Sequence, residues 1–250
     1  MKKVYLKALL LSLFFMHTQS GMAKTFGGAD ATFLDDDSFV SVQDDSEMIQ
    51  VATLYLGYYQ TIKGKPSAWI VKGNFQTIRF DTFNILDHQI YSIGGGLYHQ
   101  FNRENSLMLN LDLISKQFEL DSLDGDVYKI KASLKQKIVT TCDVKESLIL
   151  EYGDSASDSN TYTGMGLNAT VTWAPMKGTS ISAGVSWNKK IYEVEVADER
   201  TNQQFTISAA QSFMKSAYVR VGGTRKRNEN NEDGYVFYNT LLNGSLGVKF

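Results

Sequence analysis

Residues 161–192 read TYTGMGLNATVTWAPMKGTSISAGVSWNKKIY, and this stretch decides the fold class. Every second residue from Met165 to Trp173 is apolar, and the same alternation runs from Ile181 to Trp187. Successive side chains of a β-strand face opposite sides, so a period of two predicts strands that each have one apolar and one polar face. The residues 175–178, Pro-Met-Lys-Gly, predict a tight turn that joins these two strands into a hairpin.

The alternation recurs from residue 48 to the end of the chain and predicts eleven strands. These strands are 48–60, 67–80, 89–101, 106–118, 127–140, 146–153, 161–174, 179–192, 203–213, 216–225 and 235–250. Tight turns follow every second strand, at 63–66, 102–105, 141–143, 175–178 and 213–215. Longer polar segments form the other connections, at 81–88, 119–126, 154–160, 193–202 and 226–234. Short turns at one end and longer loops at the other are typical of bacterial outer-membrane barrels.

Strand length separates a membrane barrel from a soluble β-sandwich, which would also alternate. Most of the predicted strands are roughly 10–16 residues long, whereas strands of globular sheets have about 5–6 residues. Tilted strands that cross a bilayer need about 9–11 residues. Trp69, Trp173 and Trp187 fall near strand ends, where an aromatic girdle would meet the lipid–water boundary. Because lipid offers no partner for backbone N–H and C=O groups, we predict an all-β fold: a single antiparallel up-and-down transmembrane β-barrel over residues 48–250.

Composition excludes several classes of protein. The chain of 250 residues has 25 Lys and Arg against 27 Asp and Glu, without the basic excess of a nucleic-acid-binding protein, so we expect no nucleic-acid partner. Its 1 Cys excludes an intramolecular disulfide and a cysteine-cluster metal site. No nucleotide-binding or metal-binding motif occurs. We therefore expect no metal and no cofactor.

The N-terminus has the layout of a secretory signal peptide. Lys2, Lys3 and Lys7 precede the apolar run Ala8–Met16, and the small residues Gly21 to Ala23 then offer a cleavage site before Lys24. A run of nine residues is too short for a transmembrane helix, which needs about 20. Residues 1–23 are therefore predicted to be a signal peptide that directs the chain to the periplasm and then to the bacterial outer membrane.

Residues 24–47 form an acidic segment whose pattern is ambiguous. If the C-terminus and the tight turns are periplasmic, the strand at 48–60 descends, and an ascending strand must come before it. Residues 24–47, which include Phe39-Val40-Ser41-Val42, are the place for this strand. We predict twelve strands, the first one short and drawn from this segment. A barrel of ten strands, with 24–47 as an acidic plug or tail, is the alternative.

The last strand carries an additional signal. Tyr238, Leu246, Val248 and the terminal Phe250 all have the same parity in the strand. This pattern resembles the C-terminal β-signal of Gram-negative outer-membrane barrels. The resemblance implies that these four residues are recognised by the barrel-assembly machinery, and that outer-membrane lipid surrounds the folded protein.

A second resemblance is narrower. Residues 79–84, RFDTFN, followed by residues 91–98, YSIGGGLY, are similar to a hairpin of YaiO-like barrels and of surface-lipoprotein assembly modifier barrels. Those families are linked with the export of polysaccharides or lipoproteins. The resemblance implies a partner protein or an exported polysaccharide, and no functional residue is carried over from it.

Placing the apolar faces outward predicts which charged residues line the lumen. Eight are cations and two are carboxylates: Lys72, Lys116, Lys129, Lys131, Lys135, Lys137, Lys190, Arg220, Asp112 and Glu151. A basic stripe in a narrow channel would concentrate anions, whereas pairing of the lysines with Asp112 and Glu151 would make a neutral structural network. Arg225-Lys226-Arg227 is predicted to open a solvated loop with compensating acidic residues.

Three functions remain open. The first is a passive pore for small anionic or saccharide solutes, with the inward lysines as its selectivity element. The second is a non-enzymatic structural or export barrel that holds or passes a partner protein or a polysaccharide chain. The third is an outer-membrane hydrolase, for which His88 beside Asp87 in a predicted outer loop is the candidate. Since this loop pair is the whole of the catalytic evidence, we expect that the protein is not an enzyme.

Overall fold

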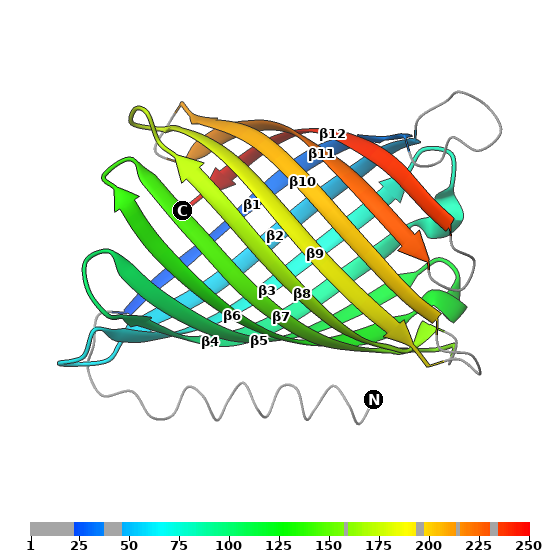
Figure 1. Ribbon diagram of the computed structural model, residues 1–250, viewed down its shortest axis with the longest axis horizontal. Coiled ribbons are helices and arrows are strands. Elements are labelled where there is room, and N and C mark those ends of the chain that lie inside the picture. Colours follow the sequence, from blue (N-terminus) through cyan, green and yellow to red (C-terminus); the bar gives the residue numbers. More distant parts are fainter. Residues whose placement is uncertain (1–22, 38–46, 158–159, 194–197, 214–215, 231–234) are drawn as a thin grey trace.

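The computed structural model describes residues 23–37, 47–157, 160–193, 198–213, 216–230 and 235–250. These residues form twelve antiparallel strands that close into one barrel (Figure 1). Each strand pairs with its neighbours in sequence, and the first strand closes against the last. The strands are β1 (Ala23–Asp36), β2 (Glu47–Thr61), β3 (Ser67–Phe80), β4 (His88–Gln100), β5 (Asn105–Phe118), β6 (Gly125–Val139), β7 (Cys142–Ser155), β8 (Tyr162–Trp173), β9 (Thr179–Tyr192), β10 (Asp198–Ser212), β11 (Ala217–Asn230) and β12 (Tyr235–Lys249).

The prediction of a closed twelve-stranded barrel is confirmed, and the ten-stranded alternative is wrong. Strand β1 is not short: it has 14 residues and pairs with β2 along its whole length. Its alternation is weak in the sequence because the outward positions Gly27, Ala29 and Ala31 carry small residues. The tetrapeptide at 39–42 and the predicted signal peptide, apart from Ala23, lie outside the described residues.

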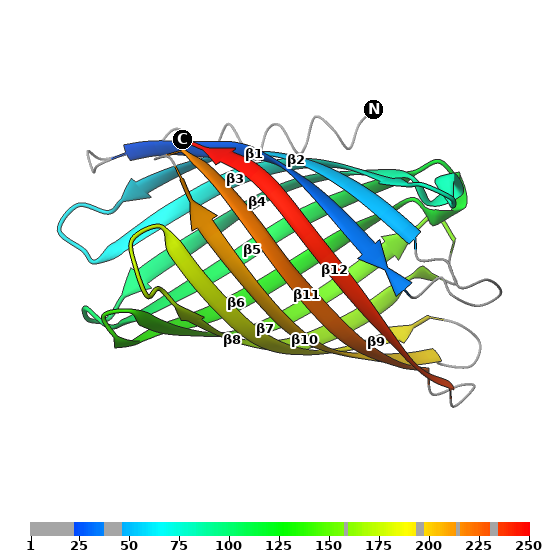
Figure 2. The ribbon, with the colours of Figure 1, turned by 90° about the horizontal axis from the view of Figure 1, so that it is seen from above.

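The two ends of the barrel differ as predicted (Figures 1 and 2). Tight turns join the strands at one end, and Gly64 and Gly178 adopt positive φ values of 72° and 85° there, a conformation that glycine accepts without strain. Two short 3₁₀ helices, η2 (Asn84–Leu86) and η3 (Asp121–Leu123), lie in connections at the other end. The end with the helices is the one predicted to face outward from the cell.

The apolar side chains of the barrel point away from its interior. Leu56 and Leu242 are 59% and 58% exposed, and most large apolar side chains on the strands share this outward position. No second sheet covers them in the described part of the chain, so the soluble sandwich is excluded and the apolar surface is left for lipid. Within the same residues, no helix is long and apolar enough to cross a membrane.

Three strand boundaries differ from the prediction by four or five residues. Strand β7 begins at Cys142 rather than at 146, β10 begins at Asp198 rather than at 203, and β11 ends at Asn230 rather than at 225. Hydrogen bonding between the strands thus continues beyond the apolar band into polar residues, where alternation of hydropathy no longer marks it. The prediction of a loop at residues 225–227 is therefore wrong, because these residues lie within β11.

Candidate pore lining

The register of the sheet defines which residues share the inner face. Residues directly opposite each other on neighbouring strands lie on the same side of a sheet. One such row crosses eight strands, and its charged members face away from the exposed leucines and therefore into the barrel. The row runs from β3 to β10 as Lys72, Gly94, Asp112, Lys129, Glu151, Gly164, Lys190 and Arg200. We call its six ionisable residues the charged row.

Ion pairs connect the members of the charged row. The Lys72 Nζ lies 2.9 Å from Asp112 Oδ1. The carboxylate of Glu151 is shared by two lysines, with Lys129 Nζ at 3.2 Å and Lys190 Nζ at 3.5 Å. Four cations and two carboxylates make up the row. Arg200 pairs with Asp198 outside the row, so the three lysines and two carboxylates leave an excess of one positive charge.

Two glycines allow these ion pairs to cross an intervening strand. Gly94 stands between Lys72 and Asp112, and a Cβ atom there would overlap Asp112 Oδ1. Gly164 stands between Glu151 and Lys190, and a Cβ atom there would lie 2.9 Å from Glu151 Cγ. The missing side chains are therefore a requirement of the network, since each carboxylate occupies the space above a glycine.

Other inward lysines have no carboxylate partner in the described part of the chain. Lys116, Lys131 and Lys145 make no ion pair there. Lys131 lies one row below the charged row and interacts electrostatically with three lysines, Lys72, Lys129 and Lys145, and with one carboxylate, Asp112. These lysines extend the basic wall formed by β3 to β7 and add to its positive charge.

The remaining predicted lining residues lie farther toward the tight turns. Lys135 pairs with Asp143 at 2.9 Å, and Lys137 stands opposite the same carboxylate in the register. Arg220 is on the opposite wall, where its guanidinium lies 5.7 Å from the Tyr218 ring. All ten predicted residues thus have inward positions in the register, but only Lys72, Asp112, Lys129, Glu151 and Lys190 belong to one row.

Sequence reasoning missed Lys24 and Lys249 at strand ends, and it missed the inward cations Arg200, Lys145 and Lys226. The last three lie outside the strand boundaries that the alternation predicted. Continuing the parity of the neighbouring polar residues beyond those boundaries would have found them. Arg200 is held by Asp198, whose Oδ2 accepts a hydrogen bond from Arg200 Nε at 2.8 Å.

The opposite wall of the lumen, from β8 to β12, is rich in neutral polar groups. The hydroxyls of Thr172 and Ser182 are 3.0 Å apart, as are those of Thr206 and Thr224. Amide side chains extend this wall through further hydrogen bonds: Gln204 to Asn202 at 2.6 Å, Asn228 to Asn239 at 3.2 Å, and Asn239 to Asp36 at 3.1 Å. The hydroxyls and amides of this wall lie among the inward cations Lys190, Arg200, Arg220 and Lys226, whereas lysines dominate the wall from β3 to β7.

The inward side chains border open space. The side chains of Lys72 and Arg200 are 43% and 55% exposed although both face the lumen. The described residues between strands form short connections, which lie at the two ends of the barrel (Figures 1 and 2). The described residues contain no cluster of His, Cys, Asp and Glu that could hold a metal ion.

The candidate hydrolase pair makes structural contacts. His88 Nδ1 lies 2.8 Å from the carbonyl oxygen of Leu86, and its ring stacks on Phe118 with centroids 4.3 Å apart. Asp87 Oδ1 accepts a hydrogen bond from the backbone N–H of Phe80 at 2.8 Å. Each side chain thus anchors the connection between β3 and β4.

The predicted assembly residues lie on the outside of the last strand. Tyr238, Leu246, Val248 and Phe250 are all exposed. Phe250 also closes the barrel, because its N–H donates to Gly27 O at 2.9 Å and its carbonyl accepts from Gly27 N at 3.2 Å. Recognition of these residues by the assembly machinery stays a prediction.

The fold and lining define a closed outer-membrane-type β-barrel with a polar lumen. Among solved structures, the COG4313 outer membrane channel from Pseudomonas putida F1 is similar, with a TM-score of 0.70, 13% identity, and coverage of 94% of this chain and 97% of that chain. The KdgM porin in complex with disordered oligogalacturonate has a TM-score of 0.50, 9% identity, and coverage of 89% of this chain and 98% of that chain. At these identities, the likeness establishes the fold alone.

No protein-family model matches the chain, and no curated protein matches its sequence. The resemblance to YaiO-like and lipoprotein assembly modifier barrels therefore stays a prediction.

Proposed function

We propose that the protein is a passive, non-enzymatic pore of the bacterial outer membrane that favours small anionic or saccharide solutes. The excess positive charge of the lumen carries this proposal. Arg200 is neutralised by Asp198, but Lys72, Lys129 and Lys190 still outnumber Asp112 and Glu151 in the charged row. The lysines one or two rows away have no carboxylate partner among the described residues. A channel wall of one sign raises the local concentration of the opposite ion.

The two sides of the lumen suit different parts of such a solute. The basic wall attracts a carboxylate or phosphate, while the Ser, Thr, Asn and Gln side chains of β8 to β12 can exchange hydrogen bonds with sugar hydroxyls. Because the inward cations keep contact with open space, a solute can meet them without rearrangement of the barrel. The names of the two similar structures, an outer membrane channel and a porin with bound oligogalacturonate, agree with this proposal.

The test is ion selectivity of the purified full-length protein in a planar bilayer. The reversal potential in a KCl gradient should show preference for chloride, and Lys190→Gln should reduce it. Lys189→Gln is the matched control, because Lys189 is the preceding residue and faces the outside of the barrel. Cation preference would contradict the proposal, and absence of conductance would favour the structural or export barrel instead.

A further inference from the structure

The basic tripeptide of β11 presents its charges to both sides of the barrel wall. Arg225 stands opposite Phe205, which is lipid-facing and exposed, and Arg227 stands opposite Tyr238 on β12. Lys226 stands opposite the buried Asn239 and faces the lumen. Two guanidinium groups therefore lie on the outer surface of the wall. They do not line the lumen, so the proposed pore function does not account for them.

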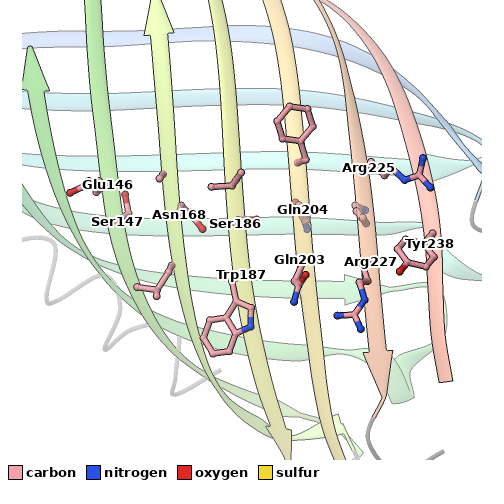
Figure 3. Close-up of a pocket in the computed structure, with 15 residues that line it drawn as sticks. Glu146, Ser147, Asn168, Ser186, Trp187, Gln203, Gln204, Arg225, Arg227 and Tyr238 are labelled. Atoms are coloured by element: carbon pink, nitrogen blue, oxygen red, sulfur yellow. The ribbon is translucent and has the colours of Figure 1, made fainter. Parts of the chain in front are cut away.

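These arginines end a groove on the outer surface of the barrel. The groove has a volume of about 750 Å³ and crosses the wall from β7 to β12 (Figure 3). Arg225, Arg227 and Tyr238 lie at one end and Glu146 at the other (Figure 3). The outward side chains between them are mainly apolar: Leu167, Ala169, Val185, Trp187 and Phe205. With strands about 4.8 Å apart, the four spacings from β7 to β11 give the groove a length of about 19 Å.

The arginines lie at the level where a lipid headgroup would meet the wall. On β11 the outward residues Val219 and Val221 are apolar and are followed by Gly223, Arg225 and Arg227 toward the predicted outer end. Trp187, an amphipathic ring typical of membrane boundaries, lines the groove in the same register row as Arg227. The groove thus passes from a charged boundary into the apolar band.

The charged end has free capacity for an anion. Arg225 makes no ion pair with any described residue, and its guanidinium lies 5.7 Å from the Tyr238 ring. Arg227 pairs with Glu229 at 2.9 Å, whereas no described carboxylate forms an ion pair with Arg225. The planar fork of an arginine matches the geometry of a phosphate group.

We propose that this groove binds a membrane lipid with an anionic phosphate headgroup. Arg225 and Arg227 hold the phosphate, and an acyl chain lies along Phe205 and Val185 toward β7. The combination of adjacent guanidinium groups with a long apolar channel on a lipid-facing wall favours an amphiphile over a soluble anion, which would use only the charged end.

Native mass spectrometry of the full-length barrel tests the proposal. The probes are phosphatidylglycerol, phosphatidylcholine with the same acyl chains, and inorganic phosphate. Wild type should retain one phosphatidylglycerol more tightly than phosphatidylcholine, and the double variant R225Q/R227Q should weaken this binding by at least about tenfold, which corresponds to about 1.4 kcal/mol. Lys226→Gln is the control for each single variant, R225Q and R227Q, since it removes one positive charge from the same strand at a side chain that faces the lumen.

A second variant tests the acyl-chain part without changing charge. Ala169→Phe fills the groove and should also weaken phosphatidylglycerol binding while both arginines remain. Equal binding by wild type and R225Q/R227Q, equal binding of the two lipids, or a loss of equal size in K226Q would overturn the proposal. Displacement of the lipid by inorganic phosphate at equal concentration would also overturn the proposal. A dimer that covers this face in place of lipid would do the same. Heat-dependent mobility in gels verifies that each variant is folded.

Discussion

Neutralising Glu151 should make the pore more selective for anions. This carboxylate is the only one of the charged row that two lysines share, with Lys129 at 3.2 Å and Lys190 at 3.5 Å. Glu151→Gln keeps the size of the side chain and leaves both ammonium groups without their counter-charge. The lumen then gains one net positive charge at a single, known position in the wall.

The size of the effect follows from Coulomb's law. A unit charge about 8 Å from a permeating ion, at an effective dielectric constant of about 40, changes the energy of that ion by about 1 kcal/mol. Because the anion is stabilised and the cation destabilised by this amount, the two changes together correspond to about a thirtyfold change in the ratio of anion to cation permeability. The screening length is about 10 Å in 0.1 M salt and about 3 Å in 1 M salt, so the effect should be large in dilute salt and nearly absent in concentrated salt.

The assay is the reversal potential of single channels across KCl gradients at both salt levels. Glu146→Gln is the matched control, because Glu146 is on the same strand and faces outward opposite Leu134 and Ala169. E146Q should conduct like wild type. If E151Q conducts normally but shows no shift toward chloride in dilute salt, or shifts toward potassium, then the charged row does not govern selectivity and the reasoning is refuted.

Three further predictions concern the wall itself, each measured by urea unfolding from lipid vesicles. Leu54→Arg places a cation on the lipid face and should cost about 2–4 kcal/mol, whereas Thr53→Arg, which faces the lumen, should cost less than about 1 kcal/mol; equal costs would show that the faces are assigned wrongly. Glu47→Ala should destabilise the barrel by about 1–3 kcal/mol, because this carboxylate is 2% exposed and accepts backbone N–H groups of the connection after β3. Gly94→Ala overpacks the inner face and should cost about 1–3 kcal/mol, while Gly95→Ala, whose added Cβ would meet only an atom at 3.7 Å, should be nearly neutral; similar losses at both positions would contradict the role given to Gly94.

The sequence predicts the barrel well because lipid imposes a simple rule on it. Outward positions must be apolar wherever they meet acyl chains, so Leu107, Leu109 and Leu111 mark β5 without ambiguity. The rule is less informative where outward residues are small, as at Ala29 and Ala31 of β1. The sequence therefore indicates this strand only weakly. The rule does not apply beyond the apolar band, where outward residues meet water. For this reason the predicted ends of β7, β10 and β11 differ from those of the structure.

The sequence predicts which charged side chains face the lumen, but it does not predict which of them form ion pairs. Parity alone placed Lys129 and Glu151 on the inner face, and their positions on adjacent strands suggested a pair. The ion pairs that span an intervening strand depend on the register of the sheet. The register places Gly94 and Gly164 between the charged groups, and so leaves room for these ion pairs. A slip of one residue would have exchanged glycines and side chains, and single-sequence periodicity does not determine the register of neighbouring strands.

The seam between β1 and β12 has a consequence for how the protein is made. Thr32 donates to Ser245 at 3.0 Å across 213 positions of sequence, and Asn239 donates to Asp36 across 203. Every other pair of neighbouring strands is a local hairpin, so closure is the one long-range event and waits for the final residues of the chain. A polypeptide that ends one strand early does not become a narrower cylinder with the same register. It is an open sheet with two unpaired edge strands. We expect these edges to pair with another chain, or the polypeptide to be degraded.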